Sequence, residues 1–572
     1  MADDTPNYKD MSLDEFLKQP DTIDFTFIND GRFQNYIADK PYIKLGTVLD
    51  RSNFVIVYTK QQYMKKIFDD FGGDYITIYP QLLSTQSIPS NDSAGISYVH
   101  RQPYLNLTGT GVLIGFVDTG IDFKQKTFIY EDGTSKIKYI WDQTIDGNPP
   151  KEMRFGSVFT QDMINEALKS QDPATVVPTK DFIGHGTFLA SVAAGRENNE
   201  YVGAAPDAEI IAVKLKPAHP FHLQRYNFSK DSQELYSSAD FMLGIKFIID
   251  KAEEANMPVV ICIGMAASFG GHDGDTILEE YISVICNRTG IVCVAAAGNE
   301  SNTKRHTMGQ IAKTGDRDNI AINVGNNVDG FPFFITNTSY DKVSAEVISP
   351  IGETTSRLPV KTGTAYTKKL VLEASTVTVR YFKDRNNIMI IDIDKPTQGI
   401  WNVVLHGDAI LNGNYHAWLP LANTISPRIE FMKPIPDYTT VIPATASRII
   451  TCGAYDSSNN SLFISSSWGP IRDQQRIAPD FVAPGVNVNG VYPSGYGTMT
   501  GTSVAAAITS GACALLLQWG IVKGNEPMMG LDRVSSLLIS GCKRVENIKY
   551  PNTQWGFGTL NLFNTFEFLK ES

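Results

Sequence analysis

Short apolar runs recur along this chain at intervals that leave room for a helix between them. A strand that helices cover on both faces is a nearly continuous apolar run, and helix-like stretches such as Gly186–Ala194 and Ser238–Asn256 lie between these runs. We therefore expect an α/β domain with a parallel sheet that carries helices on both faces. The apolar runs are Gly111–Val117, Ile210–Val213, Pro258–Ile263 and Gly290–Ala297.

The middle of the chain has a different pattern. From residue 330 to residue 437 apolar and polar residues alternate, with many Thr, Val and Ile, as in Thr376–Phe382. Alternation with a period of two is typical of strands with one buried face. The apolar runs return at Arg448–Ala454, and a helix is predicted at Val504–Trp519. The sequence thus predicts an antiparallel all-β domain inserted into the α/β domain.

The first part of the chain contains a small α+β unit. Asn53–Tyr58 is a predicted strand, Lys60–Phe71 a predicted amphipathic helix and Tyr75–Tyr79 a second strand. The small polar residues of Ser84–Gly95 predict a linker. A chain of 572 residues is too long for one core, because single cores stop growing near about 300 residues. The predicted segments are 1–96, 97–329, 330–437 (the insert) and 438–572.

Charge and hydropathy exclude several classes of partner. The formal net charge is −11 and the chain contains no run of Lys and Arg that would make a basic face, so a nucleic-acid partner is not expected. No apolar run approaches the roughly 20 residues that span a bilayer. The acidic start, Met1–Phe16, lacks the basic and apolar parts of a secretory signal, which predicts an intracellular protein with no signal peptide and no membrane span.

The six cysteines form no CxxC pair. Cys262, Cys293 and Cys513 lie inside apolar runs. Buried free thiols in a reducing compartment are the favoured interpretation, and metal or redox use is the alternative.

Four polar residues lie where an α/β domain builds its sites, at strand ends and helix starts. Asp118 and Asn299 follow apolar runs closely. His185 lies between two glycines that allow close backbone approach, and Ser503 opens a predicted helix, where N–H groups point outward. Alone, each has a structural alternative: a turn Asp or Asn, an ordinary polar His, and a helix-capping Ser.

Together the four residues predict nucleophilic catalysis. A serine hydroxyl is a weak nucleophile, so it needs a base to take its proton, a carboxylate to orient that base and donors for the developing oxyanion. Ser503 supplies the hydroxyl, His185 the base and Asp118 the carboxylate, and the Asn299 amide supplies a donor. Their order along the chain is Asp, His, Asn, Ser.

The sequences around these residues resemble the motifs of the subtilases, a family of serine endopeptidases. GFVDTGID, GHGTFLASVAAG and GTSVAAA are similar to its three catalytic motifs, and AAAGNE to its oxyanion motif. The resemblance implies a subtilisin-like sheet in which Asp118 orients the base, His185 is the general base and acid, and Ser503 is the nucleophile. It also implies that Asn299 holds the oxyanion together with the Ser503 N–H. The resemblance covers residues 97–329 and 438–565.

Substrate binding is assigned by the same resemblance. Gly264, Met265 and Ala266 match the substrate strand, where the family usually has Ser-Leu-Gly, so the backbone can bind a peptide but the pocket wall differs. Ala507 stands where the family usually has Pro, which we expect to be a mild change in the first turn of a helix. Glu300 is expected at the pocket rim, where it would favour basic or polar side chains. The remaining expected substrate-binding residues are Ala296, Ala297 and Gly298.

Residues 50–86 resemble a subtilase pro-segment, a small domain whose C-terminal tail blocks the active site. We therefore expect the tail Gln81–Gln86 to lie across the substrate strand. Self-cleavage is predicted near Gln86, and an uncut linker is the alternative.

The insert and two short sequences resemble one subgroup, the Csp germination proteases of clostridial spores. The two sequences are GGHDGDT at Gly270–Thr276 and YHAWLP at Tyr415–Pro420. In that subgroup the insert is a jelly roll, and active members process the inactive precursor of a spore-cortex hydrolase. The resemblance implies packaging in the spore and, as partners, that precursor, the chain's own pro-segment and related Csp-type proteins. A signalling pseudoprotease held shut by its pro-segment and a general intracellular scavenging protease are the alternatives.

These motifs require no cofactor. Subtilases often hold Ca²⁺ through loop carbonyls and Asp or Asn oxygens, the hard ligands that this ion prefers. Arg196–Tyr201 is a candidate loop for Ca²⁺, but a solvated turn is the favoured interpretation. We assign no metal site from the sequence and leave calcium as an open alternative.

Overall fold

The fold is taken from a computed structural model, in which the α/β part is a nine-stranded sheet. Its central strands run parallel in the order β23-β12-β10-β5-β8-β6. β24 and β7 pair antiparallel at the two ends, and β25 pairs in parallel with β23. The strands are β5 (Leu113–Asp118), β6 (Ile137–Asp142), β7 (Ser157–Thr160), β8 (Glu209–Lys214), β10 (Val259–Ile263), β12 (Ile291–Ala296), β23 (Ile450–Asp456), β24 (Ser461–Leu462) and β25 (Phe481–Pro484). The residues that the structure describes are 8, 11–49, 52–71, 82–85, 92–102, 104–196, 202–225, 228, 234–383, 385–424, 428–474 and 476–571.

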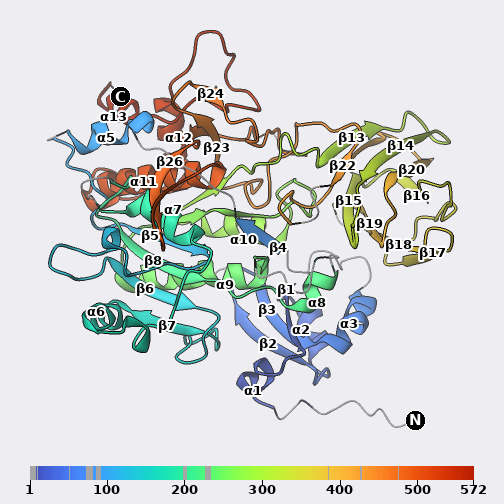
Figure 1. Ribbon diagram of the computed structural model, residues 1–572, viewed down its shortest axis with the longest axis horizontal. Helices are drawn as coiled ribbons and strands as arrows, with labels where there is room; N and C mark the ends of the chain where they lie inside the picture. The colour runs from blue at the N-terminus through green and yellow to red at the C-terminus, as the bar shows by residue number, and fades with distance from the viewer. Residues whose placement is uncertain are drawn as a thin grey trace.

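Helices cover both faces of this sheet (Figure 1). α7 (His185–Ala194) and α11 (Thr502–Leu517) pack against each other on one face, and α9 (Ser238–Ala255) covers the other, with α10 (Ile277–Ile285) beside it. Every residue of β5, β10 and β12 is buried, as expected of strands that are covered on both sides. The predicted α/β class is therefore confirmed. The other helices of this part are α5 (Ile96–His100), α6 (Gln161–Lys169), α8 (Pro220–Arg225), α12 (Leu531–Gly541) and α13 (Leu562–Glu571).

One helix in the described part of the chain is long and apolar enough to cross a membrane. It spans Thr502–Val522 and includes all of α11. Of its most apolar window, 89% is buried inside the fold, so its apolar surface serves as the core against which α7 and the sheet pack.

A three-stranded antiparallel sheet forms the N-terminal domain, in the order β1-β3-β2. β3 (Phe54–Lys60) is close to the predicted strand, and α3 (Met64–Phe71) begins later than predicted, after a 3₁₀ turn. β1 (Thr22–Ile28) and β2 (Ile43–Val48) were not predicted, because the polar residues around them mask their short apolar alternation. The predicted strand Tyr75–Tyr79 lies outside the described residues. α1 (Leu13–Leu17) and α2 (Gly31–Ile37) complete this domain.

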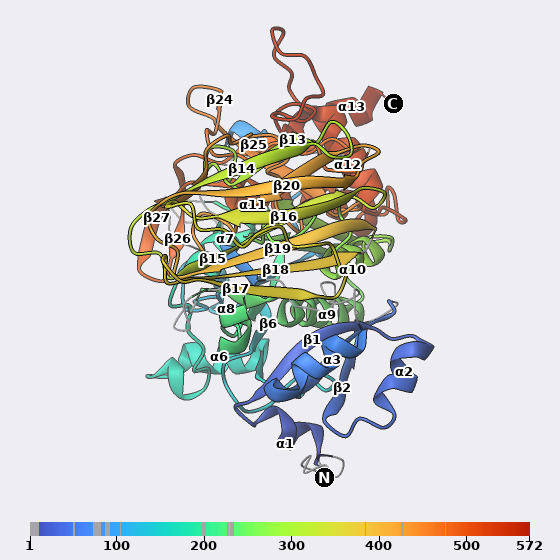
Figure 2. The ribbon, with the colours of Figure 1, turned by 90° about the vertical axis from the view of Figure 1, so that its right-hand side faces the viewer.

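In the insert, an antiparallel sheet of six strands packs on one of four (Figure 2). Buried side chains such as Phe333, Trp401 and Leu405 form the core. The predicted start at residue 330 is too late, because the two sheets already include β13 and β14 and so begin at His306. The strands are β13 (His306–Gln310), β14 (Arg317–Val324), β15 (Gly330–Thr338), β16 (Lys342–Ile348), β17 (Ala365–Leu370), β18 (Ser375–Lys383), β19 (Asn386–Asp394), β20 (Gly399–Ala409), β21 (Asn414–Trp418) and β22 (Ile429–Phe431).

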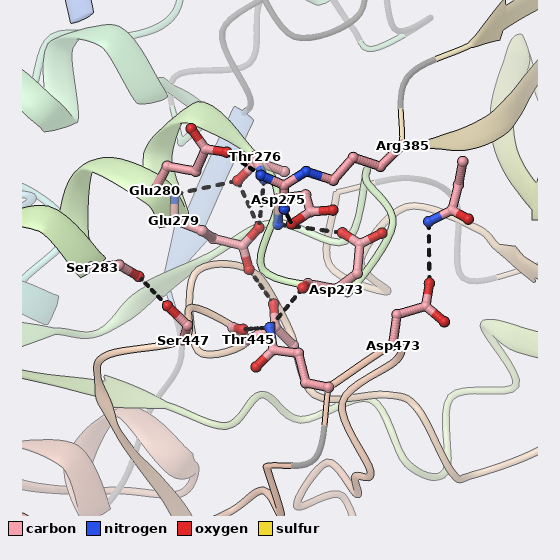
Figure 3. A network of polar contacts seen from close by, with 12 residues as sticks. Asp273, Asp275, Thr276, Glu279, Glu280, Ser283, Arg385, Thr445, Ser447 and Asp473 are labelled. Carbon is pink, nitrogen blue, oxygen red and sulfur yellow. Dashed lines mark hydrogen bonds and ion pairs between the residues drawn. The ribbon is translucent and has the colours of Figure 1, made fainter. Parts of the chain in front are cut away.

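A polar network joins the insert to the α/β part (Figure 3). Arg385, in the turn between β18 and β19, makes ion pairs with Asp275 and Glu280, which lie at the start of α10. Beside them Glu279 accepts a hydrogen bond from Thr445, and burial raises the pKa of Glu279 to about 7 although that bond lowers it. The insert is thus tied by charge to the first turn of a helix of the α/β part.

The two short sequences that resemble the Csp subgroup meet at the same junction. Trp418 of YHAWLP stacks on His272 of GGHDGDT, and His416 and His306 extend the stack. His272 also lies within hydrogen-bond distance of the carbonyl oxygens of Ser268 and Thr440. The motifs therefore hold the insert in place, and neither lies among the triad residues.

Candidate active site

A small antiparallel sheet lies beside the candidate catalytic residues. β4 (Leu82–Thr85) lies between β11 (Met265–Ala266) and β9 (Tyr236–Ser237) and pairs with both. β11 is the substrate strand expected from the sequence, and β4 is the described part of the tail Gln81–Gln86. The expected cleavage point, Gln86, lies outside the described residues.

Asp118, His185 and Ser503 form one hydrogen-bonded chain. Asp118 is the last residue of β5, His185 is the first of α7 and Ser503 is the second of α11. The His185 Nδ1 lies 2.7 and 2.9 Å from the two Asp118 carboxylate oxygens, and its Nε2 lies 3.3 Å from the Ser503 Oγ. All three side chains are buried. In this geometry the imidazole can take the serine proton while the carboxylate holds the ring in the correct tautomer.

Glycines on both sides of His185 make this arrangement fit. Gly184 caps α7 with a φ of 86°, a left-handed conformation that glycine adopts without strain. A Cβ on Gly186 would lie 2.2 Å from the Gly120 carbonyl oxygen and 3.1 Å from the Asp118 Cβ. Only a residue without a side chain lets α7 start this close to the end of β5.

Asp181 organises the same loop, although the sequence pattern did not single it out. Its Oδ1 accepts hydrogen bonds from the Thr119 Oγ1 at 2.8 Å and the Gly184 N–H at 2.7 Å. Its Oδ2 accepts from the Thr187 N–H at 3.0 Å and the Thr187 Oγ1 at 2.7 Å. The Thr119 Oγ1 in turn accepts from the Gly186 N–H at 3.0 Å. One buried carboxylate thus ties the residue after Asp118 to the turn that carries His185. An acidic residue ahead of GHG is the sequence signal for it.

Asn299 follows β12 and lies against the start of α11. Its Oδ1 accepts hydrogen bonds from the Thr502 N–H at 3.0 Å and the Thr502 Oγ1 at 3.1 Å, which fixes the orientation of the amide. The Thr502 Oγ1 also accepts from the Gly298 N–H at 3.1 Å. Because the oxygen is used here, the amide NH₂ is the part of Asn299 that can serve as an oxyanion donor, next to the N–H groups that open α11.

The predicted pocket residues lie at the ends of neighbouring strands. A Cβ on Gly264 would lie 2.4 Å from the Leu189 Cδ1, 3.0 Å from the His185 Cε1 and 3.2 Å from the Ser503 Cβ. Leu189 therefore fills the space that a serine would need, which explains why this chain departs from Ser-Leu-Gly at Gly264. The other predicted pocket residues that are buried around this position are Met265, Ala266, Ala296 and Ala297. Gly298 has a φ of 106°, and a Cβ there would lie 2.5 Å from the Val441 Cγ1.

Two sequence-based expectations are corrected by the structure. Ala507 lies in the second turn of α11, which begins at Thr502, so it is not a first-turn position. A proline there would remove a backbone donor of the helix, and alanine keeps it. Glu300 was expected at the pocket rim but is only 5% exposed, with its carboxylate facing Thr303 and Ala422. Burial raises the pKa of Glu300 to about 7, although Thr303, Arg305 and the Ala422 N–H lower it.

Among the residues that the structure describes, no group of three or more His, Cys, Asp or Glu side chains could hold a metal ion. Most of the candidate loop Arg196–Tyr201 lies outside them. All six cysteines are buried and free, as predicted, and burial raises the pKa of the Cys262 and Cys452 thiols to about 12.

A comparison with known families agrees with this geometry. The profile of the subtilase family matches residues 109–380 and 413–558, which is more than half of the chain. The chain belongs to the subtilase family of serine proteases. In fold it is similar to the CspB protease of Clostridium perfringens, with a TM-score of 0.75 and 33% identity over 84% of this chain and 99% of that one. The resemblance to the Csp proteases that the motifs predicted is therefore confirmed.

Curated relatives are more distant. The minor extracellular protease Vpr of Bacillus subtilis strain 168 is 21% identical over 563 residues, which cover 94% of this chain and 60% of Vpr. The serine protease AprX of the same organism is 31% identical over 153 residues, which cover 23% of this chain and 32% of AprX. This subtilase thus spans about 60% of the length of Vpr and a smaller share of AprX.

Proposed function

We propose that this subtilase is an endopeptidase that hydrolyses peptide bonds with Asp118, His185 and Ser503 and first cuts its own chain. The observation that carries this proposal is the position of β4. A segment of the same chain lies on the substrate strand, antiparallel to β11, beside a hydrogen-bonded triad. An extended peptide bound by backbone pairing is how a strand-binding cleft holds a substrate.

The triad geometry supports two successive transfers. In the first, the Ser503 Oγ attacks the carbonyl carbon, its proton passes to the His185 Nε2, and the oxyanion accepts hydrogen bonds from the Asn299 amide and the Ser503 N–H. The C–N bond then breaks, and His185 gives the proton to the leaving amine. In the second transfer, water loses a proton to His185 and attacks the acyl ester, which releases the new carboxyl end and restores the serine hydroxyl.

The N-terminal domain is proposed as the pro-segment. β4 pairs with β11 on one edge and with β9 on the other, so the cleft is closed on both sides by backbone pairing. The domain also reaches the α/β part through Asp24 of β1, whose carboxylate accepts a hydrogen bond from the Ser237 Oγ at 2.7 Å. Such a domain would guide folding and then compete with other substrates until it is displaced, and the cut would fall near Gln86.

The Csp resemblance supports a more specific role. The match to the CspB protease covers 84% of this chain, and both subgroup motifs form the junction between the insert and the α/β part. We therefore propose a germination protease, packaged in the spore, that activates a cortex-hydrolase precursor and acts beside related Csp-type proteins. We also propose that the insert is a jelly roll. No metal or other cofactor takes part in the proposed reaction, and calcium binding stays an open alternative.

The occupied cleft favours one second candidate. A chain whose β4 stays clamped between β9 and β11 would be a signalling protein with a silent triad. A general scavenging protease is less well supported, because it needs an open cleft.

Intact mass separates these functions. Wild-type chain and the Ser503→Ala variant would be purified in parallel and weighed before and after incubation. The enzyme predicts two fragments from wild type, split close to residue 86, and one whole chain from the variant. Two whole, folded chains would contradict self-cleavage and favour the clamped signalling protein. Broad degradation of casein by the processed enzyme would favour scavenging.

A further inference from the structure

Glu300 is buried behind the loop that carries Asn299. The Glu300 N–H donates to the Ser467 Oγ at 3.0 Å, and the Ser467 N–H donates to the Gly298 carbonyl oxygen at 2.9 Å. On its side-chain end, the Oε2 accepts from the Thr303 Oγ1 at 2.8 Å. These contacts hold a buried carboxylate at the residue next to the oxyanion donor Asn299.

The same carboxylate faces the connection Leu419–Ala422, which lies in the chain between strands β21 and β22 of the insert. The Ala422 N–H points at both oxygens of Glu300, at 3.3 and 3.5 Å. Ala422 comes just after β21 and opens a turn in which the Thr424 N–H donates to the Leu421 carbonyl oxygen at 3.0 Å. Leu419, the residue directly after β21, donates its N–H to the Arg305 carbonyl oxygen at 2.9 Å.

The connection Leu419–Ala422 also contacts the substrate strand. The Ser268 Oγ, two residues past β11, donates to the Leu419 carbonyl oxygen at 3.0 Å. The Leu421 side chain packs with Ala266 of β11 and with Val441. One short connection between two strands of the insert therefore contacts the substrate strand on one side and the loop of Asn299 on the other.

We propose that Glu300 is a positioning residue for peptide-bond hydrolysis, which holds the loop of Asn299 against the Ala422 N–H and so couples the oxyanion donor to the insert. The inference rests on the proposed protease function. Glu300 acts by holding the Asn299 amide in position, because an oxyanion donor must be placed to within a few tenths of an ångström of its ideal distance from the developing charge. Loss of the contact lets the loop relax, so it weakens binding of the transition state and leaves binding of the ground-state peptide intact.

Self-cleavage of the full chain measures this step directly. Since β4 already lies on β11 in the folded chain, self-cleavage contains no step in which a separate substrate binds. The chain would be made by cell-free translation with a short pulse of label, and the loss of full-length chain would be followed in time. Glu300→Ala removes the acceptor. Ala422→Pro removes only the donor, because position i+1 of a turn favours proline.

The expected pattern has a matched control on the same loop. Glu300→Ala and Ala422→Pro each slow self-cleavage about tenfold, and the double variant is no slower than either, because both remove one contact. Glu300→Gln, which keeps an acceptor oxygen, stays within about threefold of wild type. Ser301→Ala, whose hydroxyl instead donates to the Ile464 carbonyl oxygen, cleaves at the wild-type rate.

A second readout tests placement against simple loss of structure. In the processed enzyme, Glu300→Ala should raise the inhibition constant of a peptide boronic acid about tenfold, and that of the same peptide with a free carboxylate should not change. Equal effects on both ligands, or a Glu300→Ala variant that cleaves as fast as Ser301→Ala, would overturn the inference and leave the protease function standing. A wild-type chain that does not cleave overturns the proposed function, and the inference falls with it.

Discussion

The indole of Trp418 and the imidazole of His272 stack across the junction between the insert and the α/β part, with ring centroids 4.5 Å apart and planes 6° from parallel. His416 lies 5.4 Å from the indole and His306 lies 5.4 Å from His416, so three imidazoles share one buried stack. The His306 Nε2 and the His416 Nδ1 are 3.1 Å apart, which requires at least one of them to be neutral.

The first prediction concerns the stability of the fold at acidic pH. Burial, together with the charge of Arg472, lowers the pKa of His416 to about 3, and burial beside His416 holds the pKa of His306 well below its usual range. A folded state with a lowered histidine pKa binds fewer protons than the unfolded chain. The contribution of each such histidine to the free energy of unfolding is therefore fully present above about pH 6.5. It is lost as pH falls, by up to about 1.4 kcal/mol per pH unit.

Urea unfolding of wild type and His416→Asn between pH 7.5 and pH 4.5 checks this. The free energy of unfolding of the variant should fall less steeply on acidification than that of wild type. The comparison is made between variants because Glu279, with its raised pKa, acts in the opposite direction over the same range. Asn319→Ala, which removes an exposed side chain of the insert that carries no titratable group, should keep the wild-type slope. Equal slopes for wild type and His416→Asn would show that the stack does not titrate.

Asp181 is the subject of the second prediction. Asp181→Ala removes the acceptor of three hydrogen bonds from the turn of His185 and of one from Thr119, so the imidazole loses its alignment with Ser503. We expect self-cleavage to slow by about 10²-fold, the usual effect of a displacement of about 1 Å. Circular dichroism would show that the variant is folded. Asp172→Ala, an exposed aspartate that caps a 3₁₀ turn, should cleave normally, and equal rates for the two variants would refute the role of Asp181.

A third prediction uses the close packing at Gly264. Gly264→Ser restores the family's usual residue, but its Cβ would lie 2.4 Å from the Leu189 Cδ1. We expect this variant to cleave itself about tenfold more slowly, since the serine pushes either Leu189 or the substrate strand out of place. Adding Leu189→Val, which shortens the neighbouring side chain, should recover most of the rate. If the double variant stays as slow as Gly264→Ser alone, the clash with Leu189 is not the cause.

The fourth prediction concerns release of the N-terminal domain. Asp24→Ala leaves the Ser237 hydroxyl without its acceptor in a buried interface, which typically costs about 1–3 kcal/mol. The cleaved N-terminal domain should then dissociate about tenfold faster or more, and hydrolysis of an added fluorogenic peptide should begin after a shorter lag. Asp39→Ala, which removes an exposed carboxylate paired with the neighbouring Lys40, serves as the control. A lag that is unchanged by Asp24→Ala would mean that this contact does not hold the domain.

Much of this architecture could be predicted because the catalytic groups lie in short motifs with local causes. Asp118 ends a buried strand, His185 begins a helix between two glycines, and Ser503 opens the core helix, so each position follows from its own neighbours. Asp181 was missed because the bond that ties its loop to the end of β5 joins it to Thr119, 62 positions away, and an acidic residue ahead of GHG does not by itself reveal that partner.

The errors have physical causes of the same kind. Glu300 follows Asn299 and was expected at the pocket rim, but the connection Leu419–Ala422 of the insert contacts it, and Ala422 is 122 residues away in sequence. The insert was placed to begin at residue 330, because β13 is short and contains Gly309, which weakens the alternation that marks a strand. Tertiary packing, which the sequence does not show directly, decided both points.

The position of β4 between β9 and β11 limits which proteins this chain can cut. A target must present a segment in which both backbone edges are unpaired, since each edge finds a partner strand in the cleft. A peptide bond inside a helix, or in a strand that is already part of a sheet, is out of reach until that region unwinds. A folded precursor would therefore be cut at an exposed connecting loop, however many suitable residues the rest of its sequence contains.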